Sequence, residues 1–144
     1  MSFDEIHPLI IHFPIALLSS GFLFDFLSYL LKKKSLEFAG WWNLILGLVS
    51  ALCAIVTGLI ADYSSKPGLM DEPFPVYTNH GSLQILVSCV FLILLFWRGR
   101  LQGMLPSKPK IVLLYLSVSG IAVSILFYGS HLGAVFSGRY KIFC

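Results

Sequence analysis

The chain has 144 residues, of which 57% are hydrophobic and only 12% are charged, and its formal net charge at neutral pH is +3. Soluble domains carry about 25% charged residues. This composition, with a mean hydropathy of +0.85, excludes an ordinary soluble domain and predicts a membrane protein. The small positive excess is therefore no nucleic-acid signal. We expect the lipid bilayer, and no nucleic acid, as the surroundings of this protein.

Four apolar runs, taken in chain order, are long enough to be membrane spans. They cover residues 8–31, 40–61, 81–97 and 111–136. Each approaches or exceeds the ~20 residues with which a helix crosses a bilayer core, and only helices or closed barrels can span lipid. We therefore predict an all-α membrane protein, a single four-helix transmembrane domain over residues 1–144 with a loop at 62–80.

Basic residues are concentrated in two of the connections. The connections after the first and third runs hold seven: Lys32, Lys33, Lys34, Arg98, Arg100, Lys108 and Lys110. The opposite side, which includes both termini, holds only Lys66, Arg139 and Lys141. Because basic loops stay in the cytoplasm, we expect a multi-pass protein of the bacterial inner membrane with both termini outside.

The four histidines of the chain all fall on that outer side. His7 and His12 begin the first run, His80 opens the third, and His131 lies near the end of the fourth, while Asp62 closes the second. In lipid, small and weakly polar residues mark the contacts between helices. At 100° per residue each ionisable group continues such a stripe. The stripes are Ala16, Ser19 and Ser20 for His12; Gly47, Ala51, Ala54 and Gly58 for Asp62; Gln84 and Ser88 for His80; and Ser117, Gly120 and Ser124 for His131. We therefore expect these side chains to converge inside the bundle.

The two histidines of the first run are not equivalent. They are five residues apart, which places them about 140° apart around a helix. His12 lies roughly 6 Å along the helix from Pro8, and we expect it to point inward. His7 sits beside Pro8, a residue typical of helix starts, and we expect it to cap the helix or line an entrance.

The motifs that carry these histidines resemble a known family. They read "HPLIIHFPIALL" (residues 7–18), "GLIAD" (58–62), "NH" (79–80) and "YGSHLGAVFSG" (128–138). Together they resemble the DUF2231 family of predicted bacterial membrane proteins, across essentially the whole chain. The resemblance implies a four-helix membrane domain but no activity. Relatives that look fused to, or encoded beside, c-type cytochrome domains imply a redox partner.

Haem b is the cofactor that this pattern favours. Histidine is a usual axial ligand of haem iron, and cofactor sites in helix bundles form between facing helices. Gly129 and Gly133 flank His131 and leave room for a porphyrin. Aromatic neighbours are Phe13, Phe127, Tyr128 and Phe136. We expect His12 and His131 as the axial pair, with His80 as the alternative partner and His7 nearby, in an electron-transfer protein.

Two alternatives remain open at this stage. A zinc, copper or iron ion suits imidazole and carboxylate ligands, and His12, His80, His131 and Asp62 would supply three nitrogens and one oxygen. The protein could instead be a non-catalytic structural subunit of a membrane complex, or a homo-oligomer. Enzymatic activity stays undecided, because the sequence has no phosphate loop, dinucleotide fingerprint or nucleophile elbow.

One acidic residue lies inside the first run, toward the opposite side. Asp25 precedes Lys32 by seven residues. We expect its carboxylate to snorkel or to pair with the lysine run 32–34. A proton path would need further ionisable groups in that half, and the sequence offers only Asp25 with Asn43 near the interface.

Overall fold

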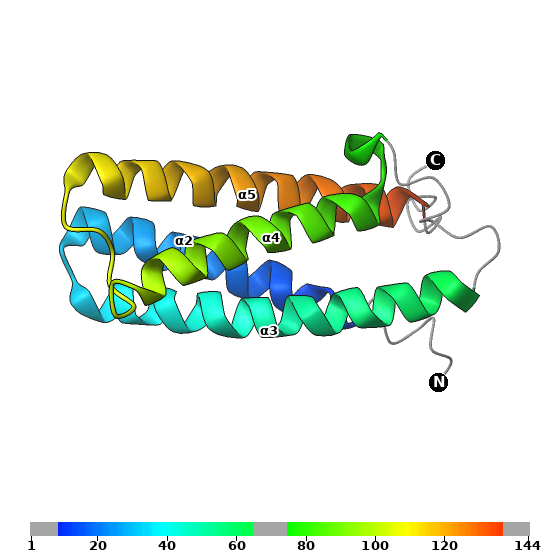
Figure 1. Ribbon diagram of the computed structural model, residues 1–144, viewed down its shortest axis with the longest axis horizontal. Helices are drawn as coiled ribbons and strands as arrows, with labels where there is room; N and C mark the ends of the chain where they lie inside the picture. The colour runs from blue at the N-terminus through cyan, green and yellow to red at the C-terminus, as the bar shows by residue number, and fades with distance from the viewer. Residues whose placement is uncertain (1–8, 65–74, 137–144) are drawn as a thin grey trace.

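The computed structural model describes residues 9–64 and 75–136, without the side chains of residues 61–64, 78 and 136. These residues form four long helices, α2 (His12–Leu31), α3 (Lys34–Ser64), α4 (His80–Gly99) and α5 (Pro109–Phe136), with a 3-10 turn η1 (Val76–Thr78) ahead of α4 (Figure 1). All four helices are long and apolar enough to cross a membrane. This confirms the expected all-α transmembrane fold.

The helix bounds differ most from the apolar runs at the starts of α2 and α3. α3 begins at Lys34, six residues before its apolar run, because a helix continues through the polar interface where hydropathy no longer marks it. Glu37 lies in its first turn, where a carboxylate suits the helix dipole. α2 begins at His12, so Pro14 falls in its first turn, where a missing N–H breaks no helical hydrogen bond.

The helices run alternately up and down and form a ring. α2 packs against α3, α3 against α4, α4 against α5, and α5 closes the ring on α2 (Figure 1). The α2–α3 turn is only Lys32 and Lys33, and Lys32 ends α2 in the left-handed region at φ 56°. The connection from α4 to α5 is longer and passes through Gln102 and Gly103, both at positive φ.

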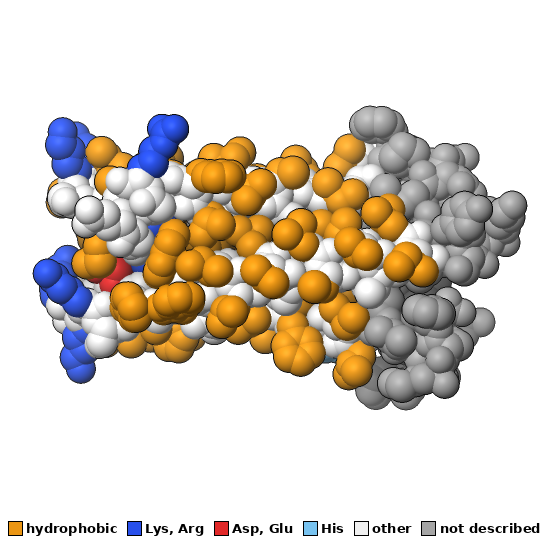
Figure 2. All heavy atoms as spheres, turned by 60° about the horizontal axis from the view of Figure 1, so that its bottom comes forward, with side chains coloured by type: hydrophobic (Ala, Val, Ile, Leu, Met, Phe, Trp, Pro, Cys, Tyr) orange, Lys and Arg blue, Asp and Glu red, His pale blue; other side chains and the backbone are white. Residues whose placement is uncertain are grey.

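The two ends of the bundle carry different side chains. We call the end with the α2–α3 and α4–α5 connections the basic end. Lysine and arginine side chains gather there, beyond a broad hydrophobic band (Figure 2). Its exposed members are Lys32, Lys33, Lys34, Arg100, Lys108 and Lys110. The other end, where α2 and α4 begin and α3 and α5 end, carries His12, His80 and His131. We call it the histidine end.

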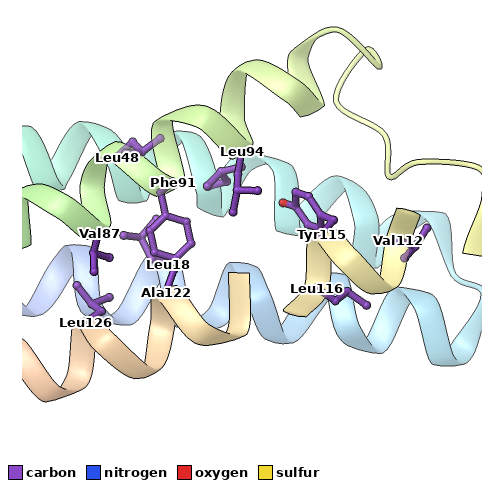
Figure 3. Close-up of a cluster of buried hydrophobic side chains, with 11 residues drawn as sticks. Leu18, Leu48, Val87, Phe91, Leu94, Val112, Tyr115, Leu116, Ala122 and Leu126 are labelled. Carbon is purple, nitrogen blue, oxygen red and sulfur yellow. The ribbon is translucent and has the colours of Figure 1, made fainter. Parts of the chain in front are cut away.

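The core fills the middle of the ring. Leu18 of α2 meets Val87 and Phe91 of α4 and Ala122 and Leu126 of α5 (Figure 3). Each of these side chains is at most 3% exposed. Large apolar side chains also cover the outside of every helix, such as those of Leu52, Ile93 and Ile121. An exterior this apolar fits a helix bundle whose outer surface faces lipid.

Glycines bring α2 and α3 into the closest contact of the ring. A Cβ atom on Gly47 would lie 2.6 Å from the Leu18 side chain, and one on Gly21 would lie 3.3 Å from the Asn43 Cβ. Small residues allow such close approach between helices in membranes. Ser20 Oγ also donates to Asn43 Oδ1 across this contact at 2.8 Å. α2 and α3 are therefore fixed as a tight pair.

Candidate functional site

A buried ion pair joins α2 to α4 near the basic end. Arg98 Nη1 donates to Asp25 Oδ2 at 2.6 Å. Arg98 is 1% exposed and Asp25 is 2% exposed. Ionisable residues inside membrane segments are costly and are usually paired. This ion pair is therefore the first candidate for a functional site.

The remaining Arg98 donors reach the other elements around it. Nε donates to the Gly103 carbonyl at 2.8 Å, and Nη2 donates to the Glu37 carbonyl at 2.6 Å. Nη1 also reaches Tyr115 Oη at 3.3 Å. A guanidinium has five donors in a fixed fork, and here that fork contacts α2, α3, α5 and the α4–α5 connection at once.

Asp25 is equally enclosed. Tyr115 Oη donates to Asp25 Oδ2 at 3.2 Å. The other carboxylate oxygen, Oδ1, is buried and has no hydrogen-bond partner among the residues that the structure describes. It lies against Gly40, where an added Cβ would come within 2.0 Å of it. Gly40 thus leaves the space that the carboxylate occupies.

We call Asp25, Gly40, Arg98 and Tyr115 the buried charge cluster, and the α4–α5 connection is folded over it. Glu37 Oε1 accepts from the Leu105 N–H. Gly103, at φ 79°, packs on Trp41, whose ring a Cβ at that position would approach to 3.0 Å. Only glycine suits both the left-handed backbone and this close approach. The connection is thereby held in one conformation over the ion pair.

This cluster corrects the expectation for Asp25. Its partner is Arg98, 73 residues away in the chain, and within the part of the chain that the structure describes Asp25 forms no ion pair with the lysine run 32–34. From the sequence, Arg98 is expected as one of the cations of the connection after the third run, and Tyr115 has no expected role. One sequence signal pointed to the pair: Asp25 is the one acid inside the first run, and Arg98 follows the third run directly on the same side. Pairing two isolated opposite charges at matching depth would have found it.

At the histidine end, His80 is the residue that the fold holds most closely. Its Nδ1 lies 2.5 Å from the Gly129 carbonyl oxygen of α5. An added Cβ on Gly133 would lie 2.8 Å from the same ring nitrogen. The imidazole therefore packs flat against a part of α5 that only glycines leave open.

Gln84, one turn further along α4, makes a second polar contact with α5. We call the contacts of His80 and Gln84 with α5 the α4–α5 seam. Its Nε2 donates to the Leu126 carbonyl at 3.3 Å and to Ser130 Oγ at 3.2 Å. Asn79 caps the start of α4 by accepting from the Ser82 N–H at 3.0 Å. Of the stripe expected to face inward on α4, His80 and Gln84 contact α5, whereas the Ser88 hydroxyl donates to the Gln84 carbonyl of its own helix. All three residues are half-buried, and the buried face of α4 is Leu83, Val87, Phe91, Leu94 and Arg98.

The stripes expected to face inward on the other three helices are buried to different extents. On α3, Gly47, Ala51 and Ala54 are buried as expected. On α5 the expectation is wrong, because His131, Ser117 and Ser124 are exposed. On α2 it is wrong for His12 and Ala16, which are exposed, whereas Ser20 of the same stripe contacts α3. The buried faces of these two helices are instead Pro14, Leu18, Gly21, Asp25 and Ser28 on α2, and Val112, Tyr115, Leu116, Ser119, Ala122, Leu126 and Gly129 on α5.

The side chains of the other two predicted ligands, His7 and Asp62, lie outside the description of the structure. His7 lies outside the described residues, and Asp62 belongs to α3 but its side chain is outside the description. Within residues 9–64 and 75–136 no three side chains of His, Cys, Asp or Glu come together as a metal-binding group. The described residues thus bring His80 to the α4–α5 seam, and they do not assemble it with His12 and His131 into one ligand set.

The histidine motifs and the four spans agree with a family comparison. A family model described as "Predicted membrane protein (DUF2231)" matches residues 4–143. The chain belongs to the DUF2231 family. No curated protein and no solved structure matches it. The DUF2231 description gives a place in the membrane and no activity, so the function of this member has to be inferred from its own residues.

Proposed function

We propose that this protein binds haem b at its histidine end and transfers electrons in the membrane. The observation that carries the proposal is the arrangement of His80. A ligating histidine usually gives its second ring N–H to a carbonyl or carboxylate, which fixes the tautomer and aims the other nitrogen at the metal. The Gly129 carbonyl is placed to accept from His80 Nδ1 in this way, which leaves Nε2 as the ligand atom.

The second ligand is proposed from the same end. His131 belongs to α5, the neighbour of α4, and His12 belongs to α2, diagonally across the ring. Both side chains are exposed, so a haem held by either would lie at the rim of the bundle. His7 is a further candidate outside the described residues. A rim site suits a cofactor that a second copy or another redox protein completes.

Each group has a separate part in this proposal. When bound, a haem with two histidine ligands exchanges one electron. Gly129 orients the His80 ring through its carbonyl, and Gly133 leaves the space in which that ring packs. Gln84 fixes the spacing of α4 and α5 below it. The exposed position of His12 and His131 suits contact with a redox partner such as a c-type cytochrome.

We also propose that the basic end is cytoplasmic and that the membrane is the bacterial inner membrane. Six exposed basic side chains lie at that end, even without Arg98, whose charge is paired with Asp25. Cytoplasmic loops carry the excess of lysine and arginine. The histidine end, and any haem there, would then face outside. Labelling of single cysteines introduced at Lys33 and at Tyr77 in intact cells tests this orientation.

Absorption spectroscopy tests the haem proposal. The full chain is expressed in haem-replete cells, purified in mild detergent, and measured oxidised and reduced. We expect a Soret band, reduced α and β bands, and stoichiometric haem by the pyridine haemochrome assay. His80→Ala should abolish or shift these bands, whereas Ser88→Ala, whose hydroxyl bonds only within α4, should keep them. Bands that survive in His80→Ala unchanged, or haem absent from every preparation, would contradict the proposal.

The same sample tests the second candidate, a bare transition-metal ion. An imidazole oriented through Nδ1 suits zinc, copper or iron as well as haem iron. Elemental analysis that finds one of these metals in stoichiometric amount without porphyrin would replace the haem proposal with a metal site. If neither is found and His80→Ala only lowers stability, the α4–α5 seam is a structural contact of a membrane subunit.

A further inference from the structure

A hollow of about 280 Å³ opens at the basic end. It lies where three elements meet: the end of α2 at Ser28 and Lys32, the start of α3 at Lys34 and Glu37, and the segment that leads into α5 at Pro109. A water molecule takes about 30 Å³ in the liquid. The hollow is therefore large enough for a small polar group such as a phosphate with its attached glycerol.

The polar lining of this hollow is net positive. Lys32 and Lys34 contribute two positive charges and Glu37 one negative charge. The Glu37 carboxylate is already engaged, because its Oε1 accepts from the Leu105 N–H. The Lys32 ammonium lies 4.3 Å from the centroid of the Tyr29 ring, which keeps it beside the hollow. A lining of this kind attracts an anion.

Ser28 and Ser107 complete the polar lining, and the apolar walls of the hollow lie at the edge of the membrane-spanning part. Tyr29, Leu105 and Val112 form these walls, and Leu31 and Leu113 nearby are exposed large hydrophobic side chains. The hollow thus lies where the last turn of α2 and the first turns of α5 leave the bilayer. A ligand here would have an anionic head beside lysines and an apolar body beside lipid.

We propose that this hollow binds the phosphate of an anionic phospholipid headgroup, with Lys32 and Lys34 as its cationic contacts. Basic pockets between transmembrane helices are known to suit such headgroups. The hollow also borders the buried charge cluster, because Glu37 lines it and gives its carbonyl to Arg98. A lipid bound there stabilises the connection that covers the ion pair. This site is independent of the haem proposal, which concerns the opposite end.

Lipid titration of the purified chain tests the site. Its thermal unfolding midpoint in detergent is measured against added phosphatidylglycerol, phosphatidylcholine with the same acyl chains, and inorganic phosphate. Because a ligand that binds the folded state stabilises it, phosphatidylglycerol should raise the midpoint and phosphatidylcholine should not. The double variant Lys32→Gln/Lys34→Gln should need roughly 30-fold more phosphatidylglycerol for the same rise.

The matched control is Lys33→Gln/Arg100→Gln, which removes two exposed charges from the same end but none from the lining. It should respond to phosphatidylglycerol as the wild type does. An equal loss in both double variants would mean diffuse charge attraction and would overturn the site. An equal rise with inorganic phosphate alone would replace the lipid with a free anion. If the Lys32→Gln/Lys34→Gln protein unfolds without lipid, the two single variants are titrated instead, under the same criterion.

Discussion

The basic end and the histidine end treat their ionisable groups in opposite ways. At the basic end, Arg98 and Asp25 are both nearly inaccessible, and the guanidinium contacts α2, α3, α5 and the α4–α5 connection. At the histidine end, His12 and His131 are exposed, and the His80 Nδ1 atom lies 2.5 Å from the Gly129 carbonyl oxygen of α5. The charged side chains of Asp25 and Arg98 are therefore buried between helices at the basic end, whereas two imidazoles are exposed at the histidine end.

This contrast separates stability from function within one small bundle. The buried pair is nearly inaccessible, and its hydrogen bonds join all four helices. Such a pair holds one arrangement because each charge, left alone, would be strongly unfavourable. The histidine end can then keep His12 and His131 at the surface of the bundle. Substitutions at Arg98, Gly40 and Gln84 should lower the stability of the bundle in that order.

Arg98→Leu should cause the largest loss of stability. It leaves the Asp25 carboxylate buried without its cation, and breaking a buried pair in this way costs about 3–5 kcal/mol. Equilibrium unfolding in mixed detergent and SDS micelles measures the change. The double variant Asp25→Leu/Arg98→Leu should recover part of the loss, because it buries no lone charge. Equal losses in the single and double variants would show that the pair does not act as a unit.

Gly40→Ala should have the next largest effect. The added Cβ would lie 2.0 Å from Asp25 Oδ1 and 3.2 Å from the Gly21 carbonyl oxygen, so either the carboxylate or helix α2 has to move. Overpacking of this kind costs about 1–3 kcal/mol. The same unfolding measurement applies. Gly99→Ala is the matched control, since its Cβ would be 3.8 Å from the Trp41 ring; if both variants lose the same stability, the contact with Asp25 is unimportant.

Gln84→Leu should have the smallest effect. It removes the hydrogen bonds that cross from α4 to Leu126 and Ser130, and interhelical hydrogen bonds in membranes contribute about 0.6 kcal/mol on average. Ser88→Ala serves as the control, because Ser88 Oγ bonds only within α4, to the Gln84 carbonyl. A loss as large as that of Arg98→Leu would show that the histidine end is as tightly closed as the basic end.

Much of the fold follows from local features of the sequence. Four long apolar runs predict four helices, and the helices are confirmed at nearly those bounds. The small-residue stripe of Gly47, Ala51 and Ala54 predicts the buried face of α3 correctly. The clustering of the histidines on one side follows from the number of spans between them. The haem and metal ligand sets remain predictions, because the described residues do not bring three ligands together.

The inward faces of α2 and α5 could not be predicted in the same way. In a soluble bundle the polar face of a helix identifies its opposite, buried face. Here the outer surface is as apolar as the core, as Leu23 and Ile121 outside and Leu18 inside illustrate. Serines on the outside of α5, such as Ser124, satisfy their hydroxyls within the helix, by donating to the Gly120 carbonyl. A serine stripe is therefore a weak guide to the inward face.

The membrane class, the four spans and the separation of basic residues from histidines follow from the sequence alone. They depend on the hydropathy of consecutive residues and on the order of the spans along the chain. The pairing of Asp25 with Arg98, the contacts of Tyr115 and Gly40 with that pair, and the contact of His80 with α5 come from the three-dimensional structure. These contacts join residues tens of positions apart. They depend on how each helix is rotated about its axis, which the close packing of side chains in the whole bundle sets and an evenly apolar sequence does not reveal.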